Sequence, residues 1–504
     1  MNTHEKTMRL RTFRLPLVVA LPLIAEACTV GPDYKLPSAI VPASYKEAAG
    51  WTVAHPADDI DRGAWWSIYS DPTLDGLEHQ IAISNQNLKA SEAAYRESLA
   101  VVQEGKSGYL PTLSLSGQAA LQKEAGAKIW DPDGRLTVAA QADWDLDVWG
   151  RIRRTVESDS ANAQASAADL ALARLSAQAT LGVDYFQLRG TDETKRLFDD
   201  TITAFTRSLD ITQNRYASGV AAESDVAQAK TQLQQAQAQA IDLGVERASL
   251  EHAIAILVGK PPADLTIAPE PMATSVPVVP TGLPSTLLER RADIAEAERK
   301  MAAANAQIGV AQAAYYPDIT LSAVIGFGIG AAGGIISASN TLWSVGASIA
   351  ETVFDGGLRR AQVEQAGATY DQSVALYRET VLTAFREVED ALAALRILEQ
   401  EATVQEQAVK SSQEATRLAI NEYKAGTIAY TQVVVAQTAE LESERSAVTV
   451  LQNRLTASVS LIEALGGGWS TDQLPSRRVV EADRSDTTQA GSTIQARNTV
   501  QARK

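Results

Sequence analysis

The second half of the chain repeats the first at an offset of about 206 residues, and this repeat constrains the fold more than any other feature. Glycines, prolines and basic pairs recur in the same order in both halves, which chance similarity between alanine-rich helices does not explain. The matching segments are RYASGVAAESDVAQAKTQL at 215–233 with EYKAGTIAYTQVVVAQTAE at 422–440, YLPTLSLSG at 109–117 with YYPDITLSA at 315–323, and LDVWGRIRR at 146–154 with TVFDGGLRR at 352–360. We therefore expect two related structural halves.

Each half opens with two segments in which apolar and polar residues alternate. These segments are 109–122, 135–149, 317–329 and 340–354. One parity is almost wholly apolar, as Leu113 and Leu115 illustrate in the first segment. Period two with one apolar face is typical of a transmembrane β-barrel strand, whose apolar side chains face lipid. A soluble β-sandwich is the alternative.

Four strands are too few to close a membrane barrel, since known examples begin at about eight strands. An open sheet edge in lipid would leave unpaired backbone N–H and C=O groups, each at a cost of several kcal/mol. We therefore expect the chain to oligomerise, so that sister copies complete the barrel.

A very long helical stretch follows each pair of strands, because residues 151–214 and 356–425 contain no proline. At 1.5 Å per residue each stretch would extend roughly 100 Å, which favours coiled-coil packing over a globular helix. Gly219 and Gly426 then mark tight reversals of the chain. The predicted return helices run over 221–258 and 428–465.

These patterns give a provisional division of the chain. The predicted parts are a signal peptide at 1–27, an N-terminal lipid-anchored segment with the first helices at 28–108, barrel hairpins at 109–150 and 315–355, helical tunnel halves at 151–258 and 356–466, an equatorial crossing and helix at 259–314, and a disordered C-terminal tail at 467–504. The crossing opens with a proline-rich loop, and the tail is polar.

The N-terminus has the layout of an export signal. Basic residues precede an apolar run at 15–25, which is shorter than the ~20 residues of a transmembrane helix. Cys28 follows, and because it is the single cysteine the chain has no disulfide framework. We interpret Cys28 as the lipidated first residue of the mature chain. Ordinary signal cleavage nearby is the alternative, since Ala25 stands where lipoprotein signals usually have leucine.

Composition excludes several classes of function. The formal charge of −16 argues against a nucleic-acid partner. The four histidines form no metal-ligand cluster, and no Ser/His/Asp, Walker or dinucleotide-binding glycine pattern is present. We therefore expect no enzyme activity, no cofactor and no metal site.

The motifs together resemble the TolC-type outer-membrane efflux proteins, and within them the NodT-like lipoprotein branch. The motifs that carry the resemblance are CTVGPDYKLP at 28–37, WDLDVWGRIRR at 144–154, LPSTLLERRADIAEAE at 283–298, IGVAQAAYYPDITLSA at 308–323, FDGGLRRAQ at 354–362 and the paired segments around Gly219 and Gly426. Each motif is weak alone, but their common order is specific.

The resemblance implies a homotrimer with a twelve-stranded barrel and a helical tunnel in the periplasm, anchored to outer-membrane lipid at Cys28. It implies a periplasmic adaptor of the membrane fusion class and an inner-membrane pump, usually of the resistance-nodulation-division type, for drugs or other small solutes. Channels of type I protein exporters or metal-ion efflux systems are alternatives within transport. A structural coiled-coil envelope protein without a pore is an alternative of another class.

The two helical reversals are the candidate docking tips. Gly219 and Val220 in the first, with Gly426 and Thr427 in the second, match the tip motifs of the family, which contact the adaptor. A glycine turn exposes backbone, so another helical tip can approach closely. The plainer interpretation is that these glycines only make the turn.

The resemblance also implies a periplasmic gate next to the tips. Asp225 and Tyr423 match a hydrogen-bonded pair that holds the pore shut, and Gln432 and Val435 stand where some members carry an acidic constriction. Because Gln432 and Val435 are uncharged, they suggest that the gate of this chain carries less charge than the gate of those members. The alternative is a solvated aspartate and a half-buried tyrosine without a gating role.

Three aspartates share the polar parity of the second alternating segment. Asp143, Asp145 and Asp147 are therefore predicted to line the lumen and to favour cations there. The alternative is that they pair with the arginines at 151, 153 and 154.

Overall fold

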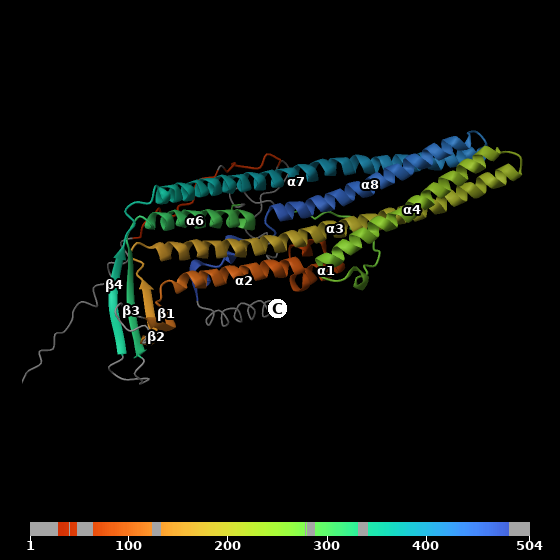
Figure 1. Ribbon diagram of the computed structural model, residues 1–504. Coiled ribbons are helices and arrows are strands. Elements are labelled where there is room, and N and C mark those ends of the chain that lie inside the picture. Colours follow the sequence, from red (N-terminus) through yellow and green to blue (C-terminus); the bar gives the residue numbers. More distant parts are fainter. Residues whose placement is uncertain are drawn as a thin grey trace, which may run out of the picture.

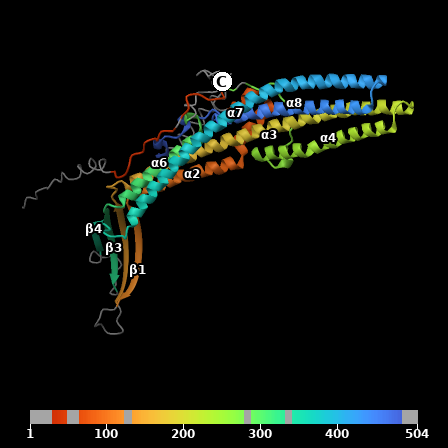
Figure 2. The same cartoon turned by 90° about the horizontal axis from the view of Figure 1, so that it is seen from above.

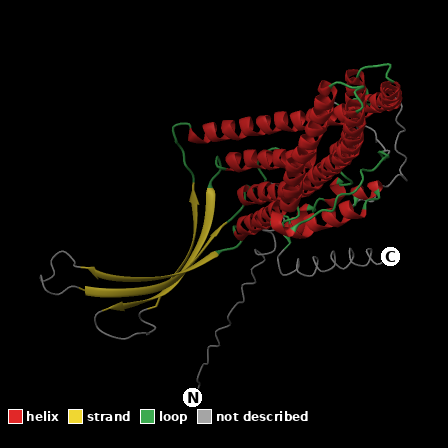
Figure 3. Cartoon of the chain, turned by 90° about the vertical axis from the view of Figure 1, so that its right-hand side faces the viewer, coloured by secondary structure: helices red, strands yellow, loops and turns green. Residues whose placement is uncertain are grey.

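The protein consists of a small curved sheet at one end of a long bundle of helices (Figure 1). The structure is a computed structural model that describes residues 29–39, 41–47, 64–122, 133–277, 279, 288–330 and 341–482. Figure 2 shows the helical part extending away from the sheet to two hairpin ends, and Figure 3 shows the curvature of the sheet.

The sheet has four antiparallel strands in the order β1-β2-β3-β4. The strands are β1 (Thr112–Gln122), β2 (Asp133–Asp145), β3 (Asp318–Gly330) and β4 (Thr341–Ala350). Each expected alternating segment overlaps one strand. β2 and β4 both end four residues earlier than the alternation predicted, because the chain turns there before α3 and α7. Among the described strands, β1 and β4 have no partner on their outer edges within this chain.

The strand register separates an apolar face of the sheet from a polar one. Directly paired residues lie on the same face. One such row contains Leu115, Ala140, Ile325 and Trp343, and a row of the opposite face contains Thr112, Asp143, Ser322 and Gly346. Leu115, Ile325 and Trp343 are exposed in the single chain, as a lipid-facing surface requires.

The helices form two long hairpins and a set of shorter helices. The hairpins are α3 (Arg151–Ala217) with α4 (Glu223–Leu257), and α7 (Leu358–Ala425) with α8 (Tyr430–Ala464). The shorter elements are η1 (Trp65–Tyr69), α1 (Pro72–Ser84), α2 (Gln86–Ser107), η2 (Pro262–Asp264), α6 (Ala292–Ala313), η4 (Thr471–Gln473) and α9 (Arg477–Glu481). Among the described residues, no helix combines the length and apolar character needed to cross a membrane.

The main hydrophobic core lies in the middle of the helical part, not at its ends. It joins side chains from α1, α3, α6, α7 and α8. Trp65 and Trp66 are buried in it and anchor the N-terminal segment by packing. Gly182 of α3 leaves room for the Trp65 ring and for Val459 of α8, since a Cβ at Gly182 would lie 3.4 Å from Trp65 and 3.3 Å from Val459. Gly182 therefore allows α3 of the first half to pack closely against α8 of the second half.

The start of the C-terminal tail is ordered, so the prediction of disorder over 467–504 is wrong for residues up to 482. Val480 of α9 is buried in a small core with Val102 of α2 and Ala163 of α3. Gln103 and Lys106 of α2 also donate hydrogen bonds to the carbonyl oxygens of Ala482 and Glu481, so the segment docks on the bundle although its composition is polar.

A fully buried carboxyl group in α1 predicts pH-dependent stability. Neither carboxylate oxygen of Glu78 has a hydrogen-bond partner among the described residues, and burial, with a smaller contribution from Asp75, raises the pKa of Glu78 to about 9. Between the unfolded pKa near 4.5 and the folded value, only the folded chain holds this proton. Stability is therefore highest below the unfolded pKa and is lost as the pH rises towards 9.

We expect Glu78→Gln to raise the apparent melting temperature at pH 8 and to flatten its dependence on pH between 5 and 9, because glutamine does not ionise. The expected gain is on the order of a few kcal/mol. Thermal unfolding followed by circular dichroism in detergent measures it, with Asp75→Asn as the control that should change the slope little. An unchanged slope in Glu78→Gln would contradict the prediction.

Candidate functional site

The two hairpin ends are glycine turns that stand clear of the rest of the chain. Gly219 has φ +72° and Gly426 has φ +80°, a left-handed conformation that favours glycine. The chain reverses through hydrogen bonds back to the preceding helix, from Val220 N to Arg215 O at 2.9 Å and from Thr427 N to Glu422 O at 3.0 Å. All four predicted tip residues are exposed.

Arg215 connects the two tips within one chain. Its guanidinium carbon lies 4.7 Å from the centre of the Tyr423 ring, and its Nη1 donates a 2.9 Å hydrogen bond to the Lys424 carbonyl oxygen. The Tyr423 ring also meets the Tyr430 ring edge to face at 5.3 Å between centroids. Tyr423 and Tyr430 are both buried, so α3, α7 and α8 share a small aromatic cluster at this end.

The predicted hydrogen bond between Asp225 and Tyr423 is not formed. The Tyr423 hydroxyl is buried without any hydrogen-bond partner among the described residues, and Asp225 is only partly buried. The ring of Tyr423, not its hydroxyl, makes the cross-hairpin contact. Gln432 and Val435 are both exposed and lie three residues apart, on neighbouring positions of one α8 face.

Arg215 was not among the predicted site residues, although it is the first residue of the repeated segment 215–233. The contact joins residues about 200 positions apart, and the repeat indicates which residues correspond but not which hairpins touch. A signal was available in hindsight: Arg215 corresponds to Glu422 in the repeat, so the two tips carry opposite charges at an equivalent position.

Two of the three predicted lumen residues lie on the polar face of the sheet. Asp143 is paired in register with Thr112 and Ser322, and its carboxylate accepts a 2.8 Å hydrogen bond from Gln141. Asp145 is exposed, accepts a 2.8 Å hydrogen bond from Thr320, and also forms a 4.0 Å ion pair with Arg151, as the alternative predicted. Their position agrees with a polar, acidic lining.

Asp147 does not line the sheet, so its prediction as a lumen residue is wrong. It lies beyond the end of β2, and its carboxylate accepts hydrogen bonds from the backbone N–H groups of Ile152 at 2.8 Å and Arg153 at 2.9 Å. The Arg153 side chain adds an ion pair of 3.2 Å to Asp147. Asp147 therefore satisfies the free N–H groups at the start of α3, and the arginine-pairing alternative is correct for this residue.

The N-terminal segment is fastened to the junction between the sheet and the helices. The buried side chain of Arg154 donates hydrogen bonds of 3.2 Å to the carbonyl oxygens of Val30 and Gly31, and it pairs with Asp33 at 3.0 Å. Cys28, the predicted lipid attachment residue, lies outside the described residues. The segment that follows it is held at the start of α3.

Close backbone contact fixes the same segment against α6. A Cβ on Gly31 would lie 2.4 Å from the Gly309 Cα, so only glycine fits. Val30 N donates a 3.1 Å hydrogen bond to the Trp149 carbonyl oxygen, and Thr29 packs against the start of α3. The Trp149 ring stacks on Tyr316 at 4.8 Å, so this tryptophan serves packing at the junction.

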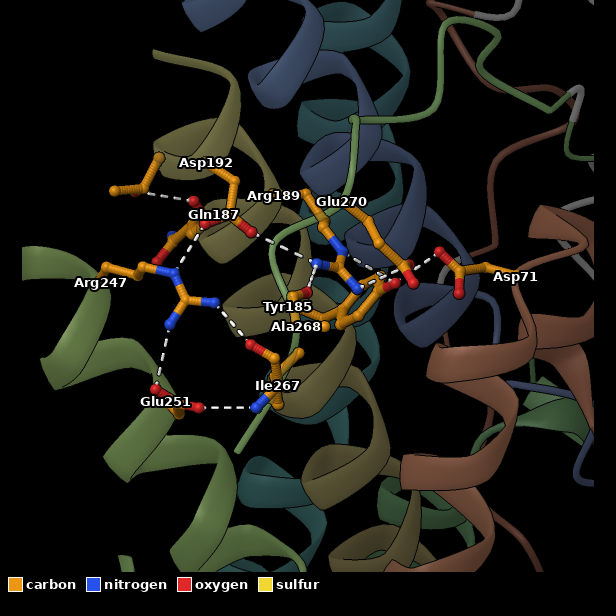
Figure 4. Close-up of polar contacts among 11 residues, drawn as sticks. Asp71, Tyr185, Gln187, Arg189, Asp192, Arg247, Glu251, Ile267, Ala268 and Glu270 are labelled. Carbon is orange, nitrogen blue, oxygen red and sulfur yellow. Dashed lines mark hydrogen bonds and ion pairs between the residues drawn. The ribbon is translucent and has the colours of Figure 1, made fainter. Parts of the chain in front are cut away.

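A buried ionic network holds the loop after α4 against the helices (Figure 4). Arg189 of α3 is 2% exposed and donates hydrogen bonds to the Tyr185 hydroxyl at 3.0 Å, the Ala268 carbonyl oxygen at 2.7 Å and Glu270 at 3.0 Å. The Tyr185 hydroxyl in turn donates to Asp71, whose other oxygen caps α1. One arginine therefore ties α1, α3 and the loop together.

Asp192 extends this network to α4 (Figure 4). Its two oxygens accept from Arg189 at 3.3 Å and from Arg247 at 2.7 Å. Arg247 also donates to the Ile267 carbonyl oxygen at 2.6 Å, and Glu251 accepts from the Ile267 N–H at 2.6 Å. Every group of this network has a protein partner, which indicates a structural clamp around the middle of the tube and not a ligand site.

Comparison with known proteins identifies the architecture. The sequence profile of the outer membrane efflux protein family matches residues 77–260 and 283–467. The chain is 31% identical to nodulation protein T of Rhizobium leguminosarum over 484 residues, which cover 93% of this chain and 96% of that protein. The chain belongs to the outer membrane efflux protein family. It is also 28% identical to the probable efflux pump outer membrane protein TtgC of Pseudomonas putida, over 88% of this chain and 94% of that protein.

Solved structures of efflux channels have the same fold. The outer-membrane channel OprN superposes with a TM-score of 0.82 at 30% identity, and the match covers 88% of this chain and 100% of the OprN chain. The open state of the Neisseria gonorrhoeae MtrE channel superposes with a TM-score of 0.78 at 26% identity, over 88% of this chain and 98% of that one. Members of this family assemble as trimers, so this chain supplies four strands of a twelve-stranded barrel and one third of the helical tunnel, as the sequence predicted. It is the outer-membrane channel subunit of a tripartite efflux system.

The clamp predicts that substitutions of two aspartates of α3, Asp192 and Asp199, lower the free energy of unfolding by very different amounts. Asp192→Asn would remove one anionic partner from each of the arginines Arg189 and Arg247. Because Glu270 and Glu251 remain as partners, we expect the loss of stability to be roughly 2–4 kcal/mol. The matched control is Asp199→Asn, which breaks an exposed pair with Lys195 and should cost less than about 1 kcal/mol.

Thermal unfolding of the two variants in detergent measures this difference. Limited proteolysis of the loop at 262–277 should become faster in Asp192→Asn only. Equal and small effects of both substitutions would show that the network does not hold the loop.

Proposed function

We propose that this protein is a lipid-anchored, passive exit duct that receives small organic solutes from a periplasmic adaptor and an inner-membrane pump of the resistance-nodulation-division class. The observation that carries the proposal is the placement of two exposed glycine tips at one end of the helices and an apolar-faced sheet at the other. A tube with these ends connects a membrane to a docking partner about 100 Å away.

The fastened N-terminal segment supports lipid attachment at Cys28. Thr29 packs at the start of α3, directly below the sheet. Adjacent Cα atoms are about 3.8 Å apart, so acyl chains on Cys28 would begin close to the boundary between membrane and periplasm. An anchor at this height would reinforce the insertion of the sheet.

The tips support a docking role because they are both exposed and chemically accessible. Val220 is 64% exposed, and nothing lies within 4 Å of the position that a Cβ on Gly219 would occupy. Helical tips of an adaptor would pack against Val220 and Thr427 in the same way in each repeat. Gln432 and Val435 lie behind the second tip, where they would narrow the pore with uncharged side chains.

The relatives suggest the class of solute. Their names describe efflux of toluene, solvents, antibiotics and pyoverdine. We infer that this channel passes small organic solutes selected by its pump, with Asp143 and Asp145 giving the barrel a mild preference for cations.

Membrane fractionation and lipid labelling test the proposal. We expect the exported protein to enter outer membranes as a trimer that dissociates on gels only after heating, to conduct ions in planar bilayers, and to incorporate labelled palmitate. Cys28→Ala should abolish the label while trimers still form, whereas Thr29→Ala should retain both. A soluble monomer would refute the channel, and an unlabelled wild-type trimer would favour ordinary signal cleavage.

A substitution at the first tip tests docking separately. Val220→Arg should weaken binding of the purified adaptor of the same system roughly tenfold, because a charge replaces an exposed apolar contact. Ile83→Arg is the control, since Ile83 of α1 is similarly exposed, at 73%, but lies far from the tips. Both variants should form normal trimers. Equal adaptor affinity of the two variants would remove Val220 from the docking surface.

A further inference from the structure

Helices α3 and α8 form the seam between the two long hairpins, and two side-chain contacts mark its antiparallel register. Gln437 of α8 donates a 3.0 Å hydrogen bond from Nε2 to the Ser208 hydroxyl of α3. About two turns further from the tips, the Arg445 guanidinium carbon lies 5.5 Å from the centre of the Phe198 ring. The seam therefore has one defined alignment in the structure.

The apolar residues of this seam do not by themselves distinguish one alignment from another. On α8 they recur every seven residues, and all of them pack against the apolar clusters of the helical part: Val434, Leu441, Val448, Leu455 and Ile462. A shift of α8 by one heptad, about 10 Å at 1.5 Å per residue, would place each of these side chains where its neighbour lies now. A shifted alignment would keep most of the apolar contacts.

Two buried polar residues interrupt the apolar seam. On α3, Ser208 lies between Phe205 and Leu209, which belong to two different apolar clusters, and Gln437 has the same relation to members of these clusters on α8. Gln437 is 3% exposed and Ser208 is 6% exposed. These two residues are called the register pair below.

The register pair fits only one alignment of the seam. A shift by one heptad in either direction would place Glu444 or Tyr430 opposite Ser208 in place of Gln437. Glu444 would bring a carboxylate into a buried position, which is costly without a cationic partner. Tyr430 would have to leave its ring contact with Tyr423. Both shifts are therefore unfavourable at this one position.

The register pair also occurs in only one half of the repeat. Gln437 corresponds to Lys230 of α4, and Ser208 corresponds to Ala415 of α7. Both counterparts are exposed. The pair therefore labels the contact between α3 and α8 and has no equivalent between α7 and α4.

Stability alone does not account for an amide at this position. Gln437 Oε1 has no hydrogen-bond partner among the described residues, and the same holds for both amide atoms of the buried Gln232 on α4. A buried polar atom without a partner lowers stability, so an apolar residue would serve packing better. In coiled coils, a buried polar residue of this kind fixes the register at a cost in stability.

The register pair lies at the same distance along the chain from both tips. Gly219 follows Ser208 by 11 residues, and Gly426 precedes Gln437 by 11 residues. Since α3 runs towards the tips and α8 runs away from them, this spacing brings the two tips to the same height at one end of the molecule (Figure 1). A shift by one heptad would displace one tip from the other by about 10 Å.

We propose that the register pair sets the alignment of the two hairpins within a chain and thereby holds both tips level. The hydrogen bond between Gln437 and Ser208 selects one of several alignments that the apolar residues would allow. Level tips present Val220 and Thr427 together, as a partner that contacts both requires. The inference rests on the proposed docking role of the tips.

Disulfide trapping tests the alignment directly. Thr201 and Glu444 line the same groove beside α3 and α8, so Thr201→Cys with Glu444→Cys reports the native alignment. Thr194 lies one heptad away on α3, so Thr194→Cys with Glu444→Cys reports a shifted alignment. After mild oxidation of the purified protein, peptide mass spectrometry gives the fraction of chains with each internal disulfide.

We expect the native disulfide to exceed the shifted one roughly tenfold when the register pair is intact, and no more than about threefold with Gln437→Leu, because leucine makes the seam uniformly apolar. Ser208→Ala removes only the hydroxyl and should lower the ratio as well. The exchanged pair, Ser208→Gln with Gln437→Ser, should restore it. The control is Gln234→Leu, the same substitution at an exposed position of α4, which should leave the ratio unchanged.

Thermal unfolding and adaptor binding separate this role from simple packing. Gln437→Leu should melt at the wild-type temperature or above it, since it removes a buried amide oxygen that has no partner. Its affinity for the purified adaptor of the same system should fall about threefold, because the tips of shifted chains stand at different heights. The exchanged pair should regain the wild-type affinity.

The outcomes distinguish this inference from the proposed function. A Gln437→Leu chain that forms only the native disulfide would overturn the role of the register pair while the channel stands. An altered disulfide ratio with wild-type adaptor affinity would overturn the link to the tips. Wild-type protein that shows the tenfold ratio but neither trimerises nor binds the adaptor would refute the proposed function and leave the alignment within the chain intact.

Discussion

The structure depends on the requirement that every backbone N–H and C=O group in lipid be hydrogen-bonded. One chain satisfies this requirement across three strand pairings but leaves the outer edges of β1 and β4 open. Three copies close the sheet, and closure then determines the rest of the assembly. The helices that continue from the barrel must be spaced around it like the strands. The duplicated helical hairpins of the three chains therefore form a ring. The apolar outer face and polar inner face follow from the strand register that runs through Leu115, Ala140 and Ile325.

Stability is distributed unevenly along the tube, and this distribution suits a channel that opens at one end. The largest core and the buried clamp around Arg189 and Asp192 lie in the middle of the helical part. The tip has only a small cluster around Tyr423 and Tyr430, and it ends in exposed glycine turns. Local opening is easiest where few apolar contacts must be broken. The middle of the tube therefore holds the chain together while the tip can rearrange.

Periodicity and repetition in the sequence predicted the elements well, because strands and long helices are local consequences of residue spacing. The sites depended on non-local contacts and were predicted less completely. Asp147 has the same strand parity as Asp143 and Asp145, but it caps α3, since alternation does not reveal where a strand gives way to a helix. Arg215 emerged only from the structure, because composition and period carry no information about which hairpins are neighbours. The C-terminal segment is docked by one buried valine and by hydrogen bonds from α2, and composition reveals neither contact.

The repeat gives the two hairpins of one chain equivalent residues, and one difference in charge distinguishes them, since Arg215 of the first hairpin corresponds to Glu422 of the second. A contact between these hairpins forms at the high effective concentration of two segments that share one polypeptide, so it does not require trimerisation. The contact between Arg215 and Tyr423 is already present in the single chain. The boundaries between chains form only on trimerisation, and they repeat one heterologous contact around a closed ring. The contacts within a chain can therefore form before the ring closes, and the contacts between chains then complete the tunnel.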